Sequence, residues 1–192
     1  MFIFGYGSLV WNPNFPYVKM RWGFIKGWKR RFWQQSPDHR GTPENMGRVA
    51  TLVRHGTVHE ADEFDEGEGG TCWGVLYEVD SKDEIAVLEY LNVREVAGYE
   101  IVYLDVFIPR GGSGVEDLFI TYNDDGNEMK KEACDDGHHI VVKSLVYTAT
   151  SENEHFIGGK ESMLDCSRVI ATAKVMRVYR SISINNQMLS HR

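Results

Sequence analysis

The chain has 192 residues, of which 42% are hydrophobic and 26% charged, a composition typical of one globular domain. Because 21 Lys and Arg face 28 Asp and Glu, the net charge of −7 argues against a basic nucleic-acid-binding surface. No apolar run approaches the roughly 18 residues of a membrane span, and three widely spaced cysteines favour a reducing, cytosolic setting over a disulfide framework.

In its first half the chain alternates strand patterns with turn residues. Residues 2–4 predict a short buried strand that stops at Gly5, where two glycines bracket one tyrosine. No basic residue precedes this strand, so we expect no signal peptide. Residues 21–34 and 47–53 are the next predicted strands, with a loop between them. The acidic stretch at 60–70 is typical of a solvated surface loop.

The second half adds strands and the first helix. Ser81 and Glu84 have the spacing of a capping box, and the apolar spacing after them predicts a helix over about 81–92. A second polar insertion occupies 123–137, and a helical pattern at 161–173 leads into a frayed C-terminal end. The further predicted strands are 71–79, 99–108, 115–122 and 138–149. Six or seven strands with one or two helices predict an α+β fold, a mixed, barrel-like sheet with flanking helices.

Several familiar kinds of site fit the sequence poorly. Cys134, His138 and His139 match no zinc-finger spacing, so we expect no metal. Ser8 lacks the second glycine of a nucleophile elbow, and no phosphate-loop lysine follows it. What remains is the glycine turn itself. Its consecutive amides either bind a carboxylate or a developing oxyanion, or simply form a tight structural turn.

Glu95 is the second candidate, because it follows the end of the predicted helix. The negative end of the helix dipole disfavours an ionised carboxylate. Burial would raise the pKa of Glu95 further, toward that of a useful general base. The spacing alone leaves open whether Glu95 is such a base or a surface acid.

An ordered set of sequence runs resembles the ChaC family, the glutathione-specific γ-glutamylcyclotransferases. The runs are FGYGSLVWNPNFPY (4–17), RRFW (30–33), DHRGTP (38–43), GRVATLV (47–53), WGVLYEV (73–79), EYLNVREVAGY (89–99) and LVYTATSENEHFIG (145–158). The resemblance departs from the family pattern at Val96 and Ala97, and again after residue 158. We therefore expect one cyclotransferase-like domain at 1–158 and a divergent C-terminal tail, partly helical or frayed, at 159–192.

The resemblance implies a γ-glutamylcyclotransferase-like fold, a mixed β-barrel of about six to seven strands flanked by helices. It implies that Glu95 is the catalytic base and that the loop after the first strand holds the γ-glutamyl group. The predicted substrate-binding residues are Ile3, Phe4, Gly5, Tyr6, Gly7, Ser8 and Leu9, to which we add Tyr147. The implied activity is that of a lyase that converts reduced glutathione into 5-oxoproline and Cys-Gly.

The family also implies a cytosolic enzyme that uses no cofactor and no metal, and we expect a monomer without nucleic-acid or membrane partners. Two alternatives stay open: a cyclotransferase for other γ-glutamyl amides, and a catalytically inactive glutathione-binding paralogue or isoform. Asp38, His39, Arg40 and Arg48 are polar residues within the matching runs. They could line the site, but we favour a cluster of structural ion pairs.

Overall fold

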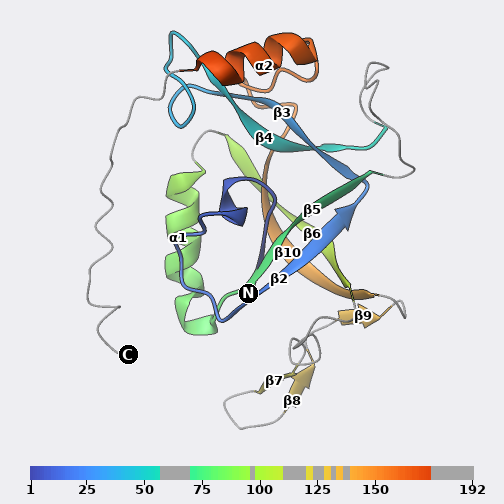
Figure 1. Ribbon diagram of the computed structural model, residues 1–192. Helices are drawn as coiled ribbons and strands as arrows, with labels where there is room; N and C mark the ends of the chain where they lie inside the picture. The colour runs from blue at the N-terminus through green and yellow to red at the C-terminus, as the bar shows by residue number, and fades with distance from the viewer. Residues whose placement is uncertain are drawn as a thin grey trace.

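The computed structural model describes residues 1–56, 70–95, 98–109 and 139–173, together with the backbone of three short strands between residues 120 and 135. A central sheet is built from β1 (Phe2–Gly5), β2 (Lys19–Lys26), β5 (Thr71–Glu78), β6 (Tyr99–Pro109), β9 (Ala133–Asp135) and β10 (His139–Ala149). A separate hairpin, β3 (Trp28–Ser36) and β4 (Gly47–Arg54), lies across one end of it (Figure 1).

The central sheet closes into a barrel. Its strand order is β1-β5-β2-β6-β10, and β1 pairs with β10 as well, through Ile3 and Leu145. This last pairing is parallel, whereas the other neighbours in the ring are antiparallel. The mixed barrel that the sequence predicted is therefore confirmed. Five strands close the ring, β9 pairs with β10 as the sixth strand of the sheet, and β3, β4, β7 (Ile120–Tyr122) and β8 (Glu128–Lys130) lie in two separate two-stranded sheets.

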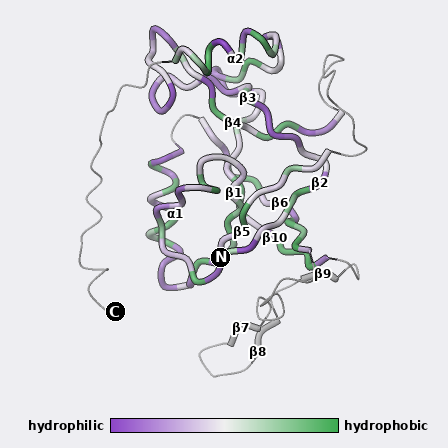
Figure 2. The backbone as a smooth tube through the Cα atoms, viewed as in Figure 1, coloured by the Kyte–Doolittle hydropathy of each residue, from purple (hydrophilic) through white to green (hydrophobic). Residues whose placement is uncertain are grey.

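Strand β1 is apolar throughout because both of its faces are buried, as is typical of a strand covered on two sides. Phe2 and Phe4 pack inside the barrel with Ile25 and Leu76. Ile3 points the other way, into a second cluster that includes Leu91 of the first helix. Figure 2 shows the matching pattern of hydrophobic positions along the barrel strands.

Helix α1 (Glu84–Arg94) packs beside the barrel and follows a single 3₁₀ turn, η2 (Ser81–Asp83). The predicted helix is confirmed, but its capping box is not formed. Asp80 caps the 3₁₀ turn by accepting a hydrogen bond of 3.2 Å from the amide of Lys82. The carboxylate of Glu84 instead accepts a hydrogen bond from the amino group of Met1. The long-range partner outcompetes the local one because it carries a full positive charge.

The single strand predicted at 21–34 was wrong, since β2 and β3 are separate strands in different sheets. They are divided at Gly27, whose φ of +77° is a left-handed conformation that favours glycine. Beyond the hairpin, residues 155–157 run along the edge of β3. The amide of Gln35 donates to the carbonyl of His155, and the amide of Ile157 donates to the carbonyl of Trp33, both at 2.9 Å.

Helix α2 (Met163–Thr172) confirms the helical pattern predicted at 161–173 and lies over the hairpin (Figure 1). Ser162 caps it by accepting a hydrogen bond of 3.1 Å from the amide of Asp165. Just before the helix, Glu161 receives two hydrogen bonds from the guanidinium of Arg48 on β4, at 3.0 and 2.9 Å. Because this guanidinium is buried, the two-point ion pair anchors the segment to the hairpin.

Some sequence predictions concern residues that are only partly described. The acidic stretch at 60–70 lies outside the described residues except for Gly70, and so does the tail after residue 173. The strand predicted at 115–122 is described only as β7 (Ile120–Tyr122), which pairs with β8 (Glu128–Lys130). The insertion at 123–137 therefore contains strands that the sequence analysis missed.

The described part of the chain has neither a helix suited to crossing a membrane nor a group of three side chains placed to bind a metal. The side chain of Cys134 and the whole of His138, which the metal hypothesis involved, lie outside that part.

We predict that Glu161→Ala lowers the free energy of unfolding by about 3 kcal/mol, because it leaves a buried guanidinium without its counter-ion. Urea unfolding followed by circular dichroism measures this change. Arg168→Ala is the matched control, since its ion pair with Asp165 is exposed and is worth less than about 1 kcal/mol. Equal effects of the two substitutions would show that the Arg48–Glu161 pair does not anchor α2.

Candidate active site

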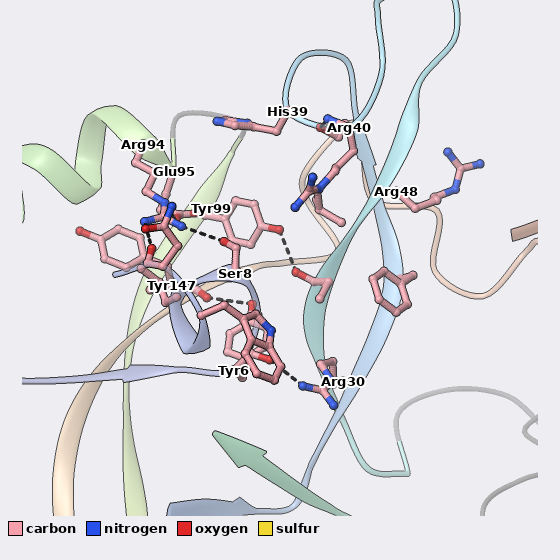
Figure 3. Close-up of a pocket in the computed structure, with 18 of the residues that line it drawn as sticks. Tyr6, Ser8, Arg30, His39, Arg40, Arg48, Arg94, Glu95, Tyr99 and Tyr147 are labelled. Carbon is pink, nitrogen blue, oxygen red and sulfur yellow. Dashed lines mark hydrogen bonds and ion pairs between the residues drawn. The ribbon is translucent and has the colours of Figure 1, made fainter. Parts of the chain in front are cut away.

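A pocket of about 600 Å³ opens between three parts of the fold: the loop after β1, the end of α1 and the hairpin β3–β4. Figure 3 shows Arg94 and Glu95 on one side of this pocket and Arg40 and Arg48 on the other. The predicted site residues that line it are Phe4, Tyr6, Gly7, Ser8, Leu9, Glu95 and Tyr147. Ile3 and Gly5 do not line it but lie in β1 beneath the loop, where Ile3 is fully buried.

The loop after β1 turns sharply into a 3₁₀ helix, η1 (Ser8–Val10). Glycine is needed at position 5, because a Cβ atom there would lie 2.7 Å from the Cβ of Leu9. The hydroxyl of Tyr6 donates to the carbonyl of Tyr147 at 2.9 Å, and the guanidinium of Arg30 donates to the carbonyl of Tyr6 at 2.8 Å. The loop is thus held by the barrel on one side and by the hairpin on the other.

Arg94, the last residue of α1, joins that loop to the helix. Its guanidinium donates to the carbonyls of Asn12 and Pro13 at 2.8 and 3.1 Å. It also donates to the hydroxyl oxygen of Ser8 at 2.9 Å. These bonds place the loop next to the residue that follows, Glu95.

Glu95 caps the C-terminus of α1 and turns its carboxylate into the pocket. The side chain is 17% exposed, which contradicts the surface-acid alternative. Burial raises the pKa of Glu95 above its ordinary value, although the charge of Arg94 and, to a smaller extent, the electrostatic effect of His39 act in the opposite direction. The nearest cation is the Nε of Arg94, 3.4 Å from the carboxylate. Glu95 is therefore an acid whose proton is held more tightly than in water.

Two tyrosines border the carboxylate. The hydroxyl of Tyr147 donates to the side-chain oxygen of Asn92 at 2.8 Å, and that of Tyr99 donates to the carbonyl of Ala50 at 2.9 Å. Burial, followed by the charge of Glu95, raises the pKa of Tyr147 to about 12 and also raises the pKa of Tyr99. Both hydroxyls thus stay protonated at neutral pH.

Some of the polar residues of the hairpin form the expected ion pairs and one does not. His39 lies 3.0 Å from the carboxylate of Asp38, and Arg48 pairs with Glu161. Arg40 has no such partner for its side chain among the described residues. All three of His39, Arg40 and Arg48 also line the pocket, so two of them combine an ion pair with a place in the pocket wall.

Sequence reasoning also missed Arg30 and Tyr99 as pocket residues. The signal was present, because both belong to the runs that carry the family resemblance. Arg30 lies on the hairpin and Tyr99 at the start of β6, and both reach the pocket only because the fold brings these strands beside the glycine loop.

Comparison with known proteins identifies the family of the chain. Residues 1–177 match the family described as ChaC-like protein. The chain belongs to the ChaC-like family. A "Glutathione-specific gamma-glutamylcyclotransferase" from Saccharomyces cerevisiae is 31% identical over 90% of this chain and 77% of its own length. A similarly named protein from Schizosaccharomyces pombe is 40% identical over 91% of this chain and 74% of its own length.

The human "Glutathione-specific gamma-glutamylcyclotransferase 1" is 32% identical over 89% of this ChaC-like chain, which spans only 61% of the human protein. Among solved structures, a glutathione-specific γ-glutamylcyclotransferase from yeast superimposes with a TM-score of 0.72 at 29% identity. That match covers 91% of this chain and 79% of the yeast chain. It confirms the predicted γ-glutamylcyclotransferase-like fold.

We predict that Glu95→Gln makes the protein more stable to unfolding at pH 7. The folded state raises the pKa of Glu95, so the wild type loses stability as the pH rises from the unfolded value, near ~4.3, through the folded one. We therefore expect the melting temperature of Glu95→Gln to exceed that of the wild type by a margin that grows from pH 4 to pH 8. Near pH 4 the two melting temperatures should be equal.

Glu89→Gln is the matched control, because Glu89 is exposed on the same helix and does not line the pocket. It should show no such pH-dependent gain. If Glu95→Gln is less stable than the wild type at pH 7, the ion pair with Arg94 outweighs the cost of burying the carboxylate.

Proposed function

We propose that this ChaC-like protein cleaves the γ-glutamyl amide of reduced glutathione by intramolecular cyclisation, releasing 5-oxoproline and Cys-Gly. The names of the relatives support this activity. The observation that carries the proposal is Glu95, a largely buried carboxylate with a raised pKa that faces the glycine loop in one pocket. It is the only acid lining the pocket among the described residues.

The substrate supplies its own nucleophile. The α-amine of the γ-glutamyl group attacks its own γ-carbonyl carbon, and the new C–N bond closes a five-membered lactam. The original amide C–N bond breaks, and Cys-Gly leaves with a free amino group. Since amine and carbonyl are already tethered, a pocket that holds one rotamer removes much of the entropic barrier.

Two proton transfers remain, and one carboxylate can perform both. The α-amine is largely protonated at neutral pH, because such amines titrate near ~8. The first proton of this ammonium group is lost to solvent before the amine attacks. As the C–N bond forms, Glu95 takes the proton that the attacking nitrogen still has to lose and delivers it to the departing amide nitrogen. A raised pKa suits this double role, because it makes the carboxylate a stronger base than an exposed glutamate and keeps its acid form accessible at higher pH than usual.

The glycine loop binds the γ-glutamyl group in this proposal. The first amides of a helical turn have no partner within the turn, and in η1 these are the amides of Ser8 and Leu9. They are suited to the α-carboxylate or to the oxyanion that develops at the γ-carbonyl. Ile3 and Gly5 contribute by placing the loop, while Phe4, Tyr6, Gly7 and Tyr147 shape the pocket around it.

The reaction uses only these groups and the substrate's own amine, so we assign it no metal or cofactor. We expect a cytosolic monomer whose partner is a small molecule rather than nucleic acid or a membrane.

We predict that Glu95→Gln lowers the rate of Cys-Gly release by ~10²-fold or more while glutathione still binds. Mass spectrometry of the products measures the rate. Glu89→Gln serves as the control, because it removes an exposed acid elsewhere on α1 and keeps Glu95. Near-normal turnover by Glu95→Gln would remove this residue from the catalytic role.

The cyclisation itself has a separate test. Glutathione with an acetylated α-amine should not be cleaved at all, because the acylated nitrogen cannot attack, whereas plain hydrolysis would release Cys-Gly and glutamate derivatives from it. γ-Glutamylalanine, assayed beside glutathione, tests the alternative of a broader cyclotransferase. Equal rates for both would assign the protein to that broader class, and binding without turnover of any amide would assign it to the inactive class.

A further inference from the structure

The pocket carries far more positive than negative charge. Four arginines, Arg30, Arg40, Arg48 and Arg94, line it, against Glu95 as the one acid among the described residues. The whole chain has a net charge of −7, so this excess is a local feature and not a consequence of composition. A concentration of guanidinium groups in a concave site is typical of carboxylate or phosphate recognition.

Three of these arginines are already engaged. Arg94 binds the glycine loop and lies beside Glu95. Arg48 gives both sides of its fork to Glu161, and Figure 3 shows its guanidinium on the far side of β4. Arg30 donates to the carbonyl of Tyr6. The guanidinium of each of these three arginines is therefore bound to another part of the protein.

Arg40 differs from the other three. Its backbone is firmly held, because its amide donates to the hydroxyl of Ser36 at 3.1 Å and Gly47 packs against its carbonyl without room for a Cβ atom. Its guanidinium, in contrast, makes no hydrogen bond or ion pair with the described residues. In Figure 3 the side chain extends from the hairpin toward the pocket. Arg40 is exposed, so its guanidinium is solvated and can bind an anion, while the hairpin holds its backbone in place.

The position of Arg40 indicates which half of the substrate it meets. If the γ-glutamyl group lies on the glycine loop and the scissile amide lies at Glu95, the leaving group extends toward the hairpin. There the half-buried side chains of Val49 and Ala50 offer an apolar surface. Arg40 lies on the same side of the pocket, within the connection between β3 and β4.

We propose that Arg40 binds the C-terminal carboxylate of the departing dipeptide and thereby selects γ-glutamyl amides whose leaving group ends in a free carboxylate. This inference rests on the proposed function. A guanidinium matches a carboxylate through two parallel N–H···O bonds. γ-Glutamylamines, which have no carboxylate on the leaving group, are therefore poor substrates, and the selectivity comes from Arg40 rather than from Glu95.

Binding to a catalytically impaired protein tests this subsite without requiring turnover. In a Glu95→Gln background, titration calorimetry compares glutathione with its glycyl monoethyl ester, which lacks only the terminal negative charge. We expect glutathione to bind at least ~10-fold more tightly than the ester. Adding Arg40→Met should weaken glutathione binding ~10-fold and leave ester binding unchanged, so that the preference disappears.

Arg31→Met is the matched control, because Arg31 lies on β3 next to Arg30 but does not line the pocket. It should keep the preference for the free acid. Arg40→Lys keeps the charge but loses the planar fork, and we expect intermediate affinity. Melting temperatures should be the same with and without Arg40→Met, because the guanidinium supports no described contact.

Equal binding of acid and ester, or a preference that survives Arg40→Met, would overturn the inference. Failure of the proposed function looks different: the wild-type protein would release no 5-oxoproline although the charge-dependent binding remained intact. In the active wild-type background, Arg40→Met should raise KM for glutathione ~10-fold with little change in kcat, as expected when binding common to ground and transition state is lost.

Discussion

The bonds made by Arg94 are the constraint on which the pocket depends. One guanidinium joins the end of α1 to two carbonyls and to the hydroxyl of Ser8 in the loop after β1. It thereby holds two segments together that are more than 80 residues apart in sequence. Glu95 follows directly, so the same contact decides both where the loop lies and where the carboxylate faces.

Burying the carboxylate of Glu95 in the pocket lowers the stability of the folded protein. Burial disfavours the charge of Glu95, and the neighbouring Arg94 and His39 offset only part of that effect. Active sites commonly keep such unfavourable groups because function needs them. The barrel makes this tolerable: β1 is buried on both faces, and the loop that it carries is fixed by bonds from Tyr6 and Arg30.

The two sides of the pocket carry different kinds of functional groups. The side formed by the glycine loop and α1 holds Glu95 and the amides of η1, to which the proposal gives proton transfer and substrate binding. The hairpin side holds cations, one of which, Arg40, has no structural partner in the described chain. In the proposed reaction, this division corresponds to the two halves of a γ-glutamyl peptide, one that cyclises and one that leaves. It also explains why an acidic protein concentrates guanidinium groups at one place.

The sequence alone predicts much of the fold and part of the candidate site. Alternating apolar residues and turn glycines determined the barrel-type fold, and the helix pattern determined α1, because local periodicity reports which face of an element is buried. The ordered motif runs indicated the glycine loop and Glu95. Other features depended on distant partners. Glu84 binds Met1 instead of completing its capping box. One apparent strand divides at Gly27, because β2 pairs with β5 in the barrel and β3 pairs with β4 in the hairpin.

Only the tertiary structure decided what the hairpin does. A sequence run such as DHRGTP indicates polar residues in a loop, but the ion pair of Arg48 with Glu161 joins residues 113 positions apart. Nothing local predicts which of several arginines keeps its charge unused. Sequence determines which faces are buried, since that is a local pattern, whereas the pairing of charges depends on through-space distances that exist only after the chain has folded.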